Sequence, residues 1–336
     1  MLAWVQHFTP SQDPAEGLGV LTVFRLIEEA MPKFFAAGKP IRIARAPGCF
    51  DVLGGMGGGR ALALPIAEAA CAAIQARDDE LVRLWSPCRD GSRAQLLSVR
   101  MSDLVPPEGP IDYDEARAFL LPDPRDRWAA YILGGLLALA REHGVAPTLG
   151  AELLVNSDVP NRCGVGASAA VTVASLQAFA LLYELELTSF ELGRLAQLVE
   201  REVLRADARA SCAMAAVMAE PGELVMLRGV AADLERRIQL PSDLEIVGLE
   251  TGTQSAPEAL VEDVEDEAVR VERFGELLAQ PPAPALRREL GELLFRSHDA
   301  YRAAGLSNGA CDLVVDFLRE RRDAGGSVLG ARMTGR

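Results

Sequence analysis

An α+β fold is predicted from two features of this 336-residue sequence. Strand-like runs gather in the first half of the chain, and apolar residues at helical spacing dominate the second half. This order favours α+β over the regular strand–helix alternation of a parallel α/β fold. No internal repeat interrupts the pattern, so a solenoid or propeller is not expected.

The first third of the chain is expected to supply one helix and then several strands. The helix is predicted at Val20–Ala36, and alternation predicts a strand at Ile41–Ala46 that ends in a turn at Pro47-Gly48. The proline- and acid-rich segment Val105–Pro124 is predicted to be a loop. Further short strands are predicted at Ala72–Ala76, Leu81–Trp85 and Ala94–Val99.

The rest of the chain is expected to be mainly helical, with isolated strands between the helices. Strands are predicted at Ala151–Val155, Glu223–Leu227, Leu244–Leu249 and Val328–Met333. Helices are predicted at Trp128–Glu142, Ala167–Leu185, Ser189–Arg205, Pro257–Leu278, Ala285–Tyr301 and Asn308–Asp323.

Composition excludes several classes of function. The formal net charge is −14 and basic residues are scattered, which argues against nucleic acid or an anionic membrane as a partner. The sequence shows no signal peptide, and no apolar run reaches the length of a membrane span, so we expect a cytoplasmic protein. Six cysteines without C-x-x-C spacing and three histidines fit a reducing compartment and argue against a zinc site. The oligomeric state is left open.

The segment between the strand at Ala151–Val155 and the helix at Ala167–Leu185 predicts a phosphate-binding loop. Glycines at 164 and 166 allow the backbone to approach an anion closely, and the N–H groups and dipole of the following helix attract it. The Ser168 hydroxyl can reach a phosphate oxygen or a magnesium ion. An ordinary strand–turn–helix junction, with Ser168 satisfying a backbone donor, is the alternative.

Three motifs in this order resemble those of the GHMP kinases, the superfamily of galactokinase and the homoserine, mevalonate and phosphomevalonate kinases. The loop resembles the second motif, with Pro160, Gly164, Gly166 and the run Ala167-Ser168-Ala169-Ala170 in matching positions. The segment Ala46–Gly55 resembles the first motif of the galactokinase branch, and its ending is similar to the plant L-arabinokinase subgroup. The segment Gly330–Gly335 resembles the opening of the third motif.

The resemblance implies the fold in more detail. It implies a ribosomal-S5-like N-terminal domain at residues 41–228, after an N-terminal extension at 1–40. A ferredoxin-like α+β domain follows at residues 229–336. Since the chain ends at Arg336, inside the third motif, we expect this second domain to be incomplete at its C-terminus.

The resemblance also implies a reaction, the transfer of the ATP γ-phosphoryl group to the anomeric hydroxyl of a monosaccharide. The substrate class is galactose, arabinose or a uronic acid, and the cofactors are ATP and Mg²⁺. Ser168 matches the magnesium-binding serine, and Glu200, which lies 32 residues further on, is the matching carboxylate. The implied phosphate-binding residues are Pro160, Gly164, Gly166, Ala167, Ser168, Ala169, Ala170, Gly330, Thr334 and Gly335, and the implied substrate-binding residues are Asp51, Gly54 and Gly55.

Two of these assignments have simpler alternatives. Glu200 can belong to a solvated helix face that also holds Glu191, Glu202 and Arg201. Asp51 can cap a turn rather than bind substrate.

The departures from the family fall where its chemistry takes place. The position of the catalytic Asp is Cys212, and the position of the motif-one Arg is Cys49. Gly57 to Arg60 replace the sugar-binding acid and its aromatic neighbour. We therefore expect impaired turnover, because losing a general base costs about two to four orders of magnitude in rate. A minor alternative is that Asp207 or Glu202, which flank the position of the lost base, takes over its role.

Two further hypotheses follow from these losses. One is a non-catalytic GHMP-fold protein that binds a nucleotide or a sugar, and the other is a gene fragment. If the family fold is correct, Cys49, Cys163 and Cys212 can converge on one thiol site, although unrelated small-residue replacements are the preferred explanation.

Overall fold

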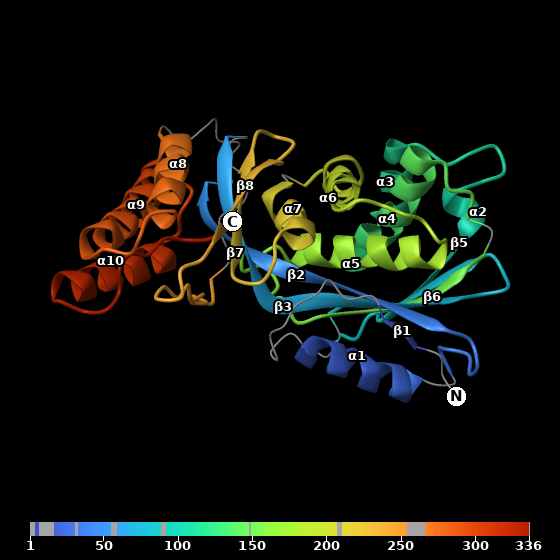
Figure 1. Cartoon of the computed structure of the whole chain (residues 1–336). Coiled ribbons are helices and arrows are strands. Elements are labelled where there is room, and N and C mark those ends of the chain that lie inside the picture. The colour runs from blue at the N-terminus through green and yellow to red at the C-terminus, as the bar shows by residue number, and fades with distance from the viewer. Residues whose placement is uncertain are drawn as a thin grey trace.

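The computed structural model describes residues 4–6, 17–30, 33–54, 59–88, 92–147, 149–206, 210–253 and 266–335. Across these ranges the chain forms an eight-stranded mixed sheet with helices on both of its faces (Figure 1). The α+β fold class predicted from the sequence is confirmed. None of the helices in these ranges has the length and apolar character needed to cross a membrane.

The sheet is built around two long antiparallel strands, β2 (Ile41–Gly54) and β3 (Arg60–Ala76). Its order is β1-β2-β3-β6-β4-β5, and the pairs β1–β2 and β4–β6 are parallel. The first residues of β3 pair with β7, which forms a hairpin with β8. The other strands are β1 (Trp4–Gln6), β4 (Leu81–Trp85), β5 (Leu96–Arg100), β6 (Ala151–Ser157), β7 (Glu223–Arg228) and β8 (Asp233–Gln239).

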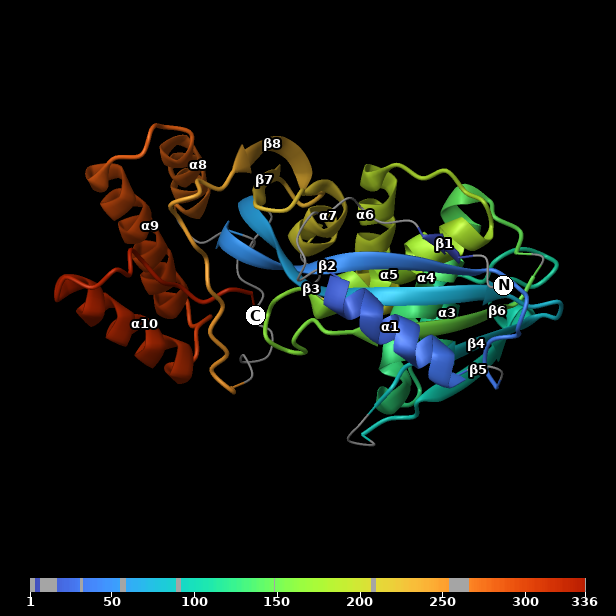
Figure 2. The same ribbon diagram turned by 60° about the horizontal axis from the view of Figure 1, so that its bottom comes forward.

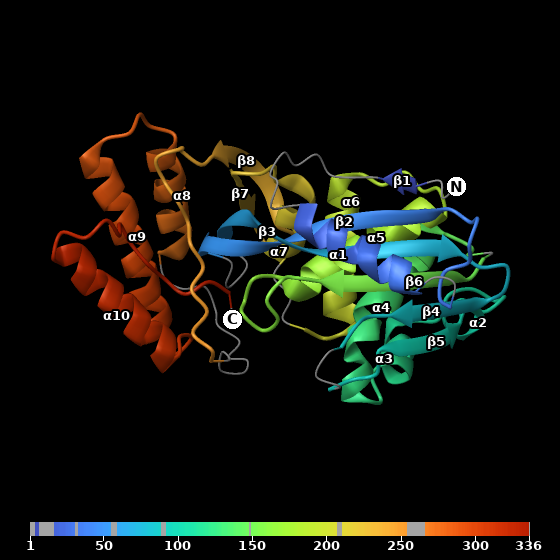
Figure 3. The same cartoon turned by 90° about the horizontal axis from the view of Figure 1, so that it is seen from below.

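Helices of the central part of the chain cover one face of the sheet, and α1 (Gly17–Ala30) covers the other (Figures 2 and 3). The helix α5 (Ala167–Leu182) packs directly on β2 and β3 and is buried along most of its length. Its sequence is apolar or small on every side, which suits a helix enclosed by other elements. Around it lie α4 (Arg127–His143), α6 (Ser189–Leu198) and α7 (Ala210–Met218).

Shorter helical segments complete this part of the molecule. The helices α2 (Met101–Leu104) and α3 (Tyr113–Leu120) precede a single 3₁₀ turn at Pro124–Asp126. A π-type turn at Val199–Val203 continues α6. It matters for the site because π-type turns are frequently found at functional positions.

Three helices lie beyond the β7–β8 hairpin at the far end of the molecule: α8 (Glu267–Leu278), α9 (Pro284–Ala303) and α10 (Gly309–Asp323) (Figure 1). Of these, α8 and α9 share a second hydrophobic cluster with the ends of β2 and β3, in which Leu53 and Leu62 lie with Phe274 and Leu277, while α10 packs against α9. The hairpin spans the boundary predicted between residues 228 and 229, and the division into two domains stays a prediction.

The predicted turn at Pro47-Gly48 is wrong, because β2 runs through it to Gly54. The pairing of β2 with β3 shifts register between Pro47 and Cys49, and such a bulge accommodates a proline within a ladder. Gly48 is required there, since a Cβ would lie 2.7 Å from the carbonyl oxygen of Val165. The strand predicted at Ala72–Ala76 likewise starts much earlier, at Arg60.

Three other predictions of secondary structure are wrong. The predicted loop Val105–Pro124 contains α3, which begins with a capping box between Asp112 and Glu115. Leu244–Leu249 is not a strand: Leu244 and Ile246 contact the second cluster, Val247 and Leu249 are exposed, and β8 forms at Asp233–Gln239 instead. Val328–Met333 is extended but unpaired, since Gly330 crosses the α9 backbone at Gly291.

Helix ends also differ from the predicted ones. The first helix ends at Ala30, before a turn that contains Phe34 and Phe35. The helix predicted at Ser189–Arg205 changes to the π-type turn after Leu198. The start predicted for the helix at Pro257 lies outside the described residues.

Candidate functional site

Gly164 and Gly166 shape the loop between β6 and α5. Their φ angles are +70° and +73°, in the left-handed region that favours glycine. A Cβ at Gly164 would lie 2.7 Å from the carbonyl oxygen of Thr334, and one at Gly166 would lie 3.0 Å from the Cβ of Cys212. Both glycines are therefore fixed by backbone conformation and by close packing.

The loop presents the amino end of α5. Gly166 caps the helix, and its carbonyl accepts the first helical hydrogen bond from the N–H of Ala170, at 2.9 Å. The N–H groups of Ala167, Ser168 and Ala169 precede that bond and are the donors a helix offers to an anion. The N–H of Cys49 donates to the carbonyl of Val165 at 3.0 Å and ties the loop to β2. Pro160, at the outer end of the loop, is exposed.

Ser168 and Glu200 meet beneath this helix end. Burial raises the pKa of Glu200 to about 7, and the hydrogen bond from the Ser168 hydroxyl offsets only part of that shift. Glu200 is 4% exposed and lies in the π-type turn, so it does not belong to a solvated face. The structure thus brings together the two residues predicted to hold a metal ion.

The surroundings of Glu200 suit a divalent cation. Within the described ranges, the ion pairs of the protein do not include one to this carboxylate. A buried carboxylate without a cationic partner carries a large desolvation cost, which a bound cation offsets. A serine hydroxyl and a carboxylate are hard oxygen ligands, and Mg²⁺ prefers this type of ligand.

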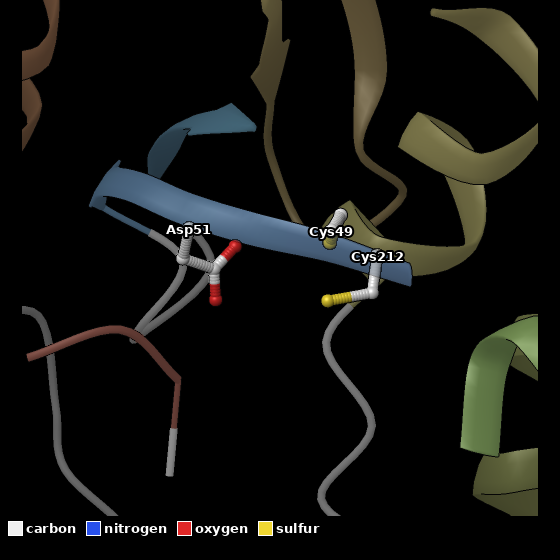
Figure 4. Close-up of side chains that lie close together, drawn as sticks. All are labelled: Cys49, Asp51 and Cys212. Atoms are coloured by element: carbon white, nitrogen blue, oxygen red, sulfur yellow. The ribbon is translucent and has the colours of Figure 1, made fainter. Parts of the chain in front are cut away.

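Cys49, Asp51 and Cys212 form a second cluster directly beside the loop (Figure 4). Two of them come from β2 and the third from the first turn of α7, and all three are buried. Their sulfur and carboxylate oxygen atoms lie within 4.8 Å of one another. The Ser211 hydroxyl donates to Asp51 Oδ1 at 3.0 Å, a partner that the sequence did not reveal.

Cys163 does not join this cluster, so the predicted convergence of Cys49, Cys163 and Cys212 is wrong in one member. Its Sγ contacts the Asn161 carbonyl at 3.4 Å and Glu250 Oε1 at 3.6 Å. Burial, followed by the charge of Glu250, raises the pKa of this thiol. Arg162, just before it, has a positive φ of 61°.

Only the C-terminal residues of the third motif approach the site. The N–H of Asp51 donates to Thr334 Oγ1 at 3.0 Å, and a Cβ at Gly335 would lie 2.0 Å from the Gly164 carbonyl oxygen. Gly330 packs instead against Gly291 of α9, where a Cβ would lie 2.5 Å from the Gly291 carbonyl oxygen. Thr334 and Gly335 therefore lie at the loop, while Gly330 allows the chain to pass close to the backbone of α9 at Gly291.

Gly54 links the site to a buried polar network. Its N–H donates to Glu267 Oε1 at 3.0 Å, and its carbonyl accepts from the Tyr301 hydroxyl at 2.8 Å. Both backbone groups of this predicted substrate-binding residue are thus used within the protein. Gly55, the other predicted glycine, and Asp207 lie outside the described residues.

Glu267 is the centre of that network, which sequence analysis missed. It accepts hydrogen bonds from Ser297 at 2.6 Å and Arg270 at 2.7 Å, and Arg332 lies 3.4 Å away. Burial acts to raise the pKa of Glu267, but the charge of Arg332 and these hydrogen bonds outweigh it and lower the pKa. Arg270 lies one turn from Glu267 on α8, but only the fold brings Ser297 and Arg332 to them, because these two residues are 30 and 65 positions away from Glu267 in the sequence.

Comparison with known proteins places this site in a family. The model of the GHMP kinases N terminal domain matches residues 130–219, which include α5, its glycine loop and Glu200. This part of the chain, with its glycine loop and its Ser–Glu pair, is therefore similar to the N-terminal domain of the GHMP kinases.

The chain is also similar to an L-arabinokinase and to a galactokinase. It is 31% identical to the L-arabinokinase of Arabidopsis thaliana over 63% of its own length, and covers 23% of that protein. It is also 31% identical to a galactokinase of Chloroflexus aggregans over 68% of its length, and covers 53% of that protein. The chain thus spans about half of the bacterial relative and less of the plant one.

A solved structure shares the fold over nearly the whole chain. The galactokinase of Lactococcus lactis, crystallised with galactose, superimposes with a TM-score of 0.66 over 93% of this chain and 87% of its own. The sequences are 17% identical, so the likeness concerns the fold. It agrees with the GHMP kinase fold expected from the three motifs.

Proposed function

We propose that this protein binds ATP with Mg²⁺ and phosphorylates a monosaccharide at its anomeric hydroxyl. The observation that carries the proposal is the Ser168–Glu200 pair beneath the glycine loop and the amino end of α5. The similarity to galactokinases and an L-arabinokinase supports a sugar of the galactose, arabinose or uronic acid class.

Each part of the site has a role in this proposal. The loop and the N–H groups at the start of α5 bind the phosphates of ATP. Ser168 and Glu200 hold the metal ion, which neutralises charge on the phosphoryl group when bound. The protein supplies position and electrostatic stabilisation, which is most of what phosphoryl transfer requires.

The two cysteines make slow turnover part of the proposal. Cys212 and Cys49 stand where the family places a base and a charge-stabilising arginine, and both are buried thiols. Losing an arginine that stabilises transferred charge costs about 10³-fold or more in rate. A second candidate function, binding of nucleotide or sugar without catalysis, is favoured by the same replacement.

One pair of measurements tests the proposal. The purified protein is assayed for ADP release with galactose, arabinose, glucuronic acid and galacturonic acid, and its melting temperature is measured with and without ATP–Mg²⁺. We expect a rise in melting temperature that grows with the logarithm of ligand excess, together with sugar-dependent ADP release.

Matched variants identify the site responsible. Glu200→Gln should remove the effect of ATP–Mg²⁺, whereas Glu202→Gln, two residues away, should keep it. A temperature shift without ADP release for any of the sugars would favour the binding protein. Absence of both effects in the folded protein would contradict nucleotide binding altogether.

A further inference from the structure

We propose that Cys49, Asp51 and Cys212 form a binding site for a thiophilic divalent metal ion of the zinc class. The site is separate from the Ser168–Glu200 pair. The inference does not depend on kinase activity, because it is drawn from the geometry and ligand chemistry of three buried side chains.

The distances fit a single metal ion. The three ligand atoms lie within 4.8 Å of one another. In a tetrahedral zinc site, Zn–S bonds of about 2.3 Å and Zn–O bonds of about 2.0 Å separate the ligands by roughly 3.3 to 3.8 Å. A contraction of about 1 Å therefore completes the site. Figure 4 shows the Asp51 carboxylate and the Cys212 sulfur extending toward the same space beside β2.

The ligands are held on supported backbone. The N–H of Cys49 donates to the Val165 carbonyl at 3.0 Å, and the N–H of Asp51 donates to Thr334 Oγ1 at 3.0 Å. The Ser211 hydroxyl donates to Asp51 Oδ1 at 3.0 Å. Such outer hydrogen bonds orient a metal-binding carboxylate, and they are a usual part of zinc sites.

The burial of the cluster strengthens the argument. Cys49 is 0% exposed, Asp51 1% and Cys212 8%. A divalent ion offsets two of the three negative charges of two thiolates and this carboxylate, and the Ser211 hydroxyl donates a hydrogen bond to the carboxylate.

The ligand types select the metal. Two thiolates favour zinc over magnesium, whereas the oxygen ligands Ser168 and Glu200 favour magnesium. Each thiol loses its proton when its sulfur binds the metal, so zinc binding releases two protons to solvent and involves no change of oxidation state. Three protein ligands leave the fourth tetrahedral position for water or a small ligand.

The spacing of cysteines along the sequence argued against zinc, and the fold changes that conclusion. Zinc motifs are recognised from ligands that lie a few residues apart. Here β2 supplies Cys49 and Asp51, and α7 supplies Cys212 from the other end of the domain. Gly166, which contacts Cys212, places the site immediately beside the phosphate loop.

Cobalt substitution tests the proposal. The reduced, metal-free protein is titrated anaerobically with Co²⁺, and the thiolate-to-cobalt charge-transfer band and the visible d–d bands are recorded. We expect one equivalent of tetrahedral Co²⁺, displaced by one equivalent of Zn²⁺. Cys49→Ser and Cys212→Ser should weaken binding about 100-fold or more, and Ser211→Ala should weaken it about 10-fold.

The controls use cysteines outside the cluster. Cys163→Ser and Cys88→Ser should bind Co²⁺ with an unchanged spectrum. Because a cluster variant can fail to fold, thiol labelling of the wild-type protein gives a second measurement, in which Zn²⁺ should protect two of the six cysteines.

Three results would overturn the proposal. One is an octahedral Co²⁺ spectrum without a charge-transfer band. Another is equal binding by Cys49→Ser, Cys212→Ser and the wild-type protein. The third is a Cys49–Cys212 disulfide in the isolated protein whose reduction yields no metal binding.

Discussion

Glu200 and Glu267 are both buried glutamates, and their surroundings shift their pKa values in opposite directions. Glu200 has a serine hydroxyl as its partner, and burial raises its pKa to about 7. Glu267 is close to Arg332 and Arg270, whose guanidinium groups and hydrogen bonds lower its pKa despite burial. Two guanidinium groups compensate the charge of Glu267, whereas the ion pairs found among the described residues include none to Glu200.

This difference separates a structural site from a binding site. Glu267 joins α8 to Gly54 at the end of β2, and through Arg332 it joins both to the segment after α10. Glu200 contributes little to such connections, and its ionised form is costly in the free protein. Perturbed carboxylates of the second kind are typical of functional sites.

The largest effect on stability is expected for a substitution at Glu267, the structural member of the pair. Glu267→Gln should lower the free energy of unfolding by roughly 3 kcal/mol, because it leaves the buried guanidinium of Arg332 without its counter-charge. Urea denaturation at pH 7 measures the change. The control Glu276→Gln, on the exposed face of the same helix, should change stability by less than about 0.5 kcal/mol. A similar small loss for Glu267→Gln would show that the network is not structural.

A substitution at Glu200 is expected to change the free energy of unfolding in the opposite direction. In metal-free buffer at pH 8, Glu200→Gln should raise the free energy of unfolding by about 1 to 3 kcal/mol, because ionising the buried carboxylate is no longer required. For a raised pKa the folded state holds more protons between about pH 4.5 and 7, so wild-type stability falls across this window as pH rises. The gain should be much smaller at pH 5, where most of the window still lies above the pH of the measurement. Destabilisation at both pH values would contradict the interpretation.

A pH effect of intermediate size is expected at His298, in the network around Glu267. The His298 Nδ1 accepts from the N–H of Met333 at 3.3 Å, and Nε2 lies 3.1 Å from Asp312 Oδ1, which defines a neutral ring with its proton on Nε2. Burial lowers the pKa of His298, although the charge of Asp312 opposes this.

Because the pKa is lowered by folding, the unfolded chain takes up the proton first. The stability contribution is complete above about pH 6.5 and declines as pH falls below it. Denaturation curves at pH 7 and pH 5 should therefore differ by about 1 kcal/mol more in the wild type than in His298→Asn. If the wild type and His298→Asn lose the same free energy of unfolding between pH 7 and pH 5, titration of His298 does not contribute to the loss of stability in acid.

The smallest stability effect is expected for Ser168→Ala. Losing one hydroxyl should change the free energy of unfolding by about 1 kcal/mol or less. The same variant should weaken ATP–Mg²⁺ binding, measured by calorimetry, while Ser189→Ala on the exposed start of α6 should not. An unchanged affinity of Ser168→Ala for ATP–Mg²⁺ would show that Ser168 does not take part in nucleotide binding.

Local signals explain what the sequence predicted well. The glycine loop and α5 were predicted because two glycines, a proline and a run of small residues lie within a dozen positions. The helix α3 was missed although its capping box, Asp112 to Glu115, is equally local. The prolines around α3 led to the prediction of a loop, although the segment itself contains the capping box.

Long-range contacts explain what the sequence did not predict. The strand β2 continues through Pro47-Gly48 because β3 pairs with it on both sides of the bulge. The strand β8 has no apolar alternation and exists because β7 pairs with it. The resemblance grouped Cys49, Cys163 and Cys212 and assigned Asp51 to substrate binding, but it did not predict the contact between Asp51 and Ser211, because that contact depends on how β2 and α7 pack.

The close approach of Gly164 and Gly335 has a thermodynamic consequence. Neither position has room for a side chain, so the phosphate loop and the segment around Thr334 pack directly, backbone against backbone. If a phosphate stabilises the loop, it also stabilises the docking of that segment, and the coupling free energy is equal in both directions. Binding affinity at the loop is therefore a reporter of the order of a segment that begins beside α9, at Gly330.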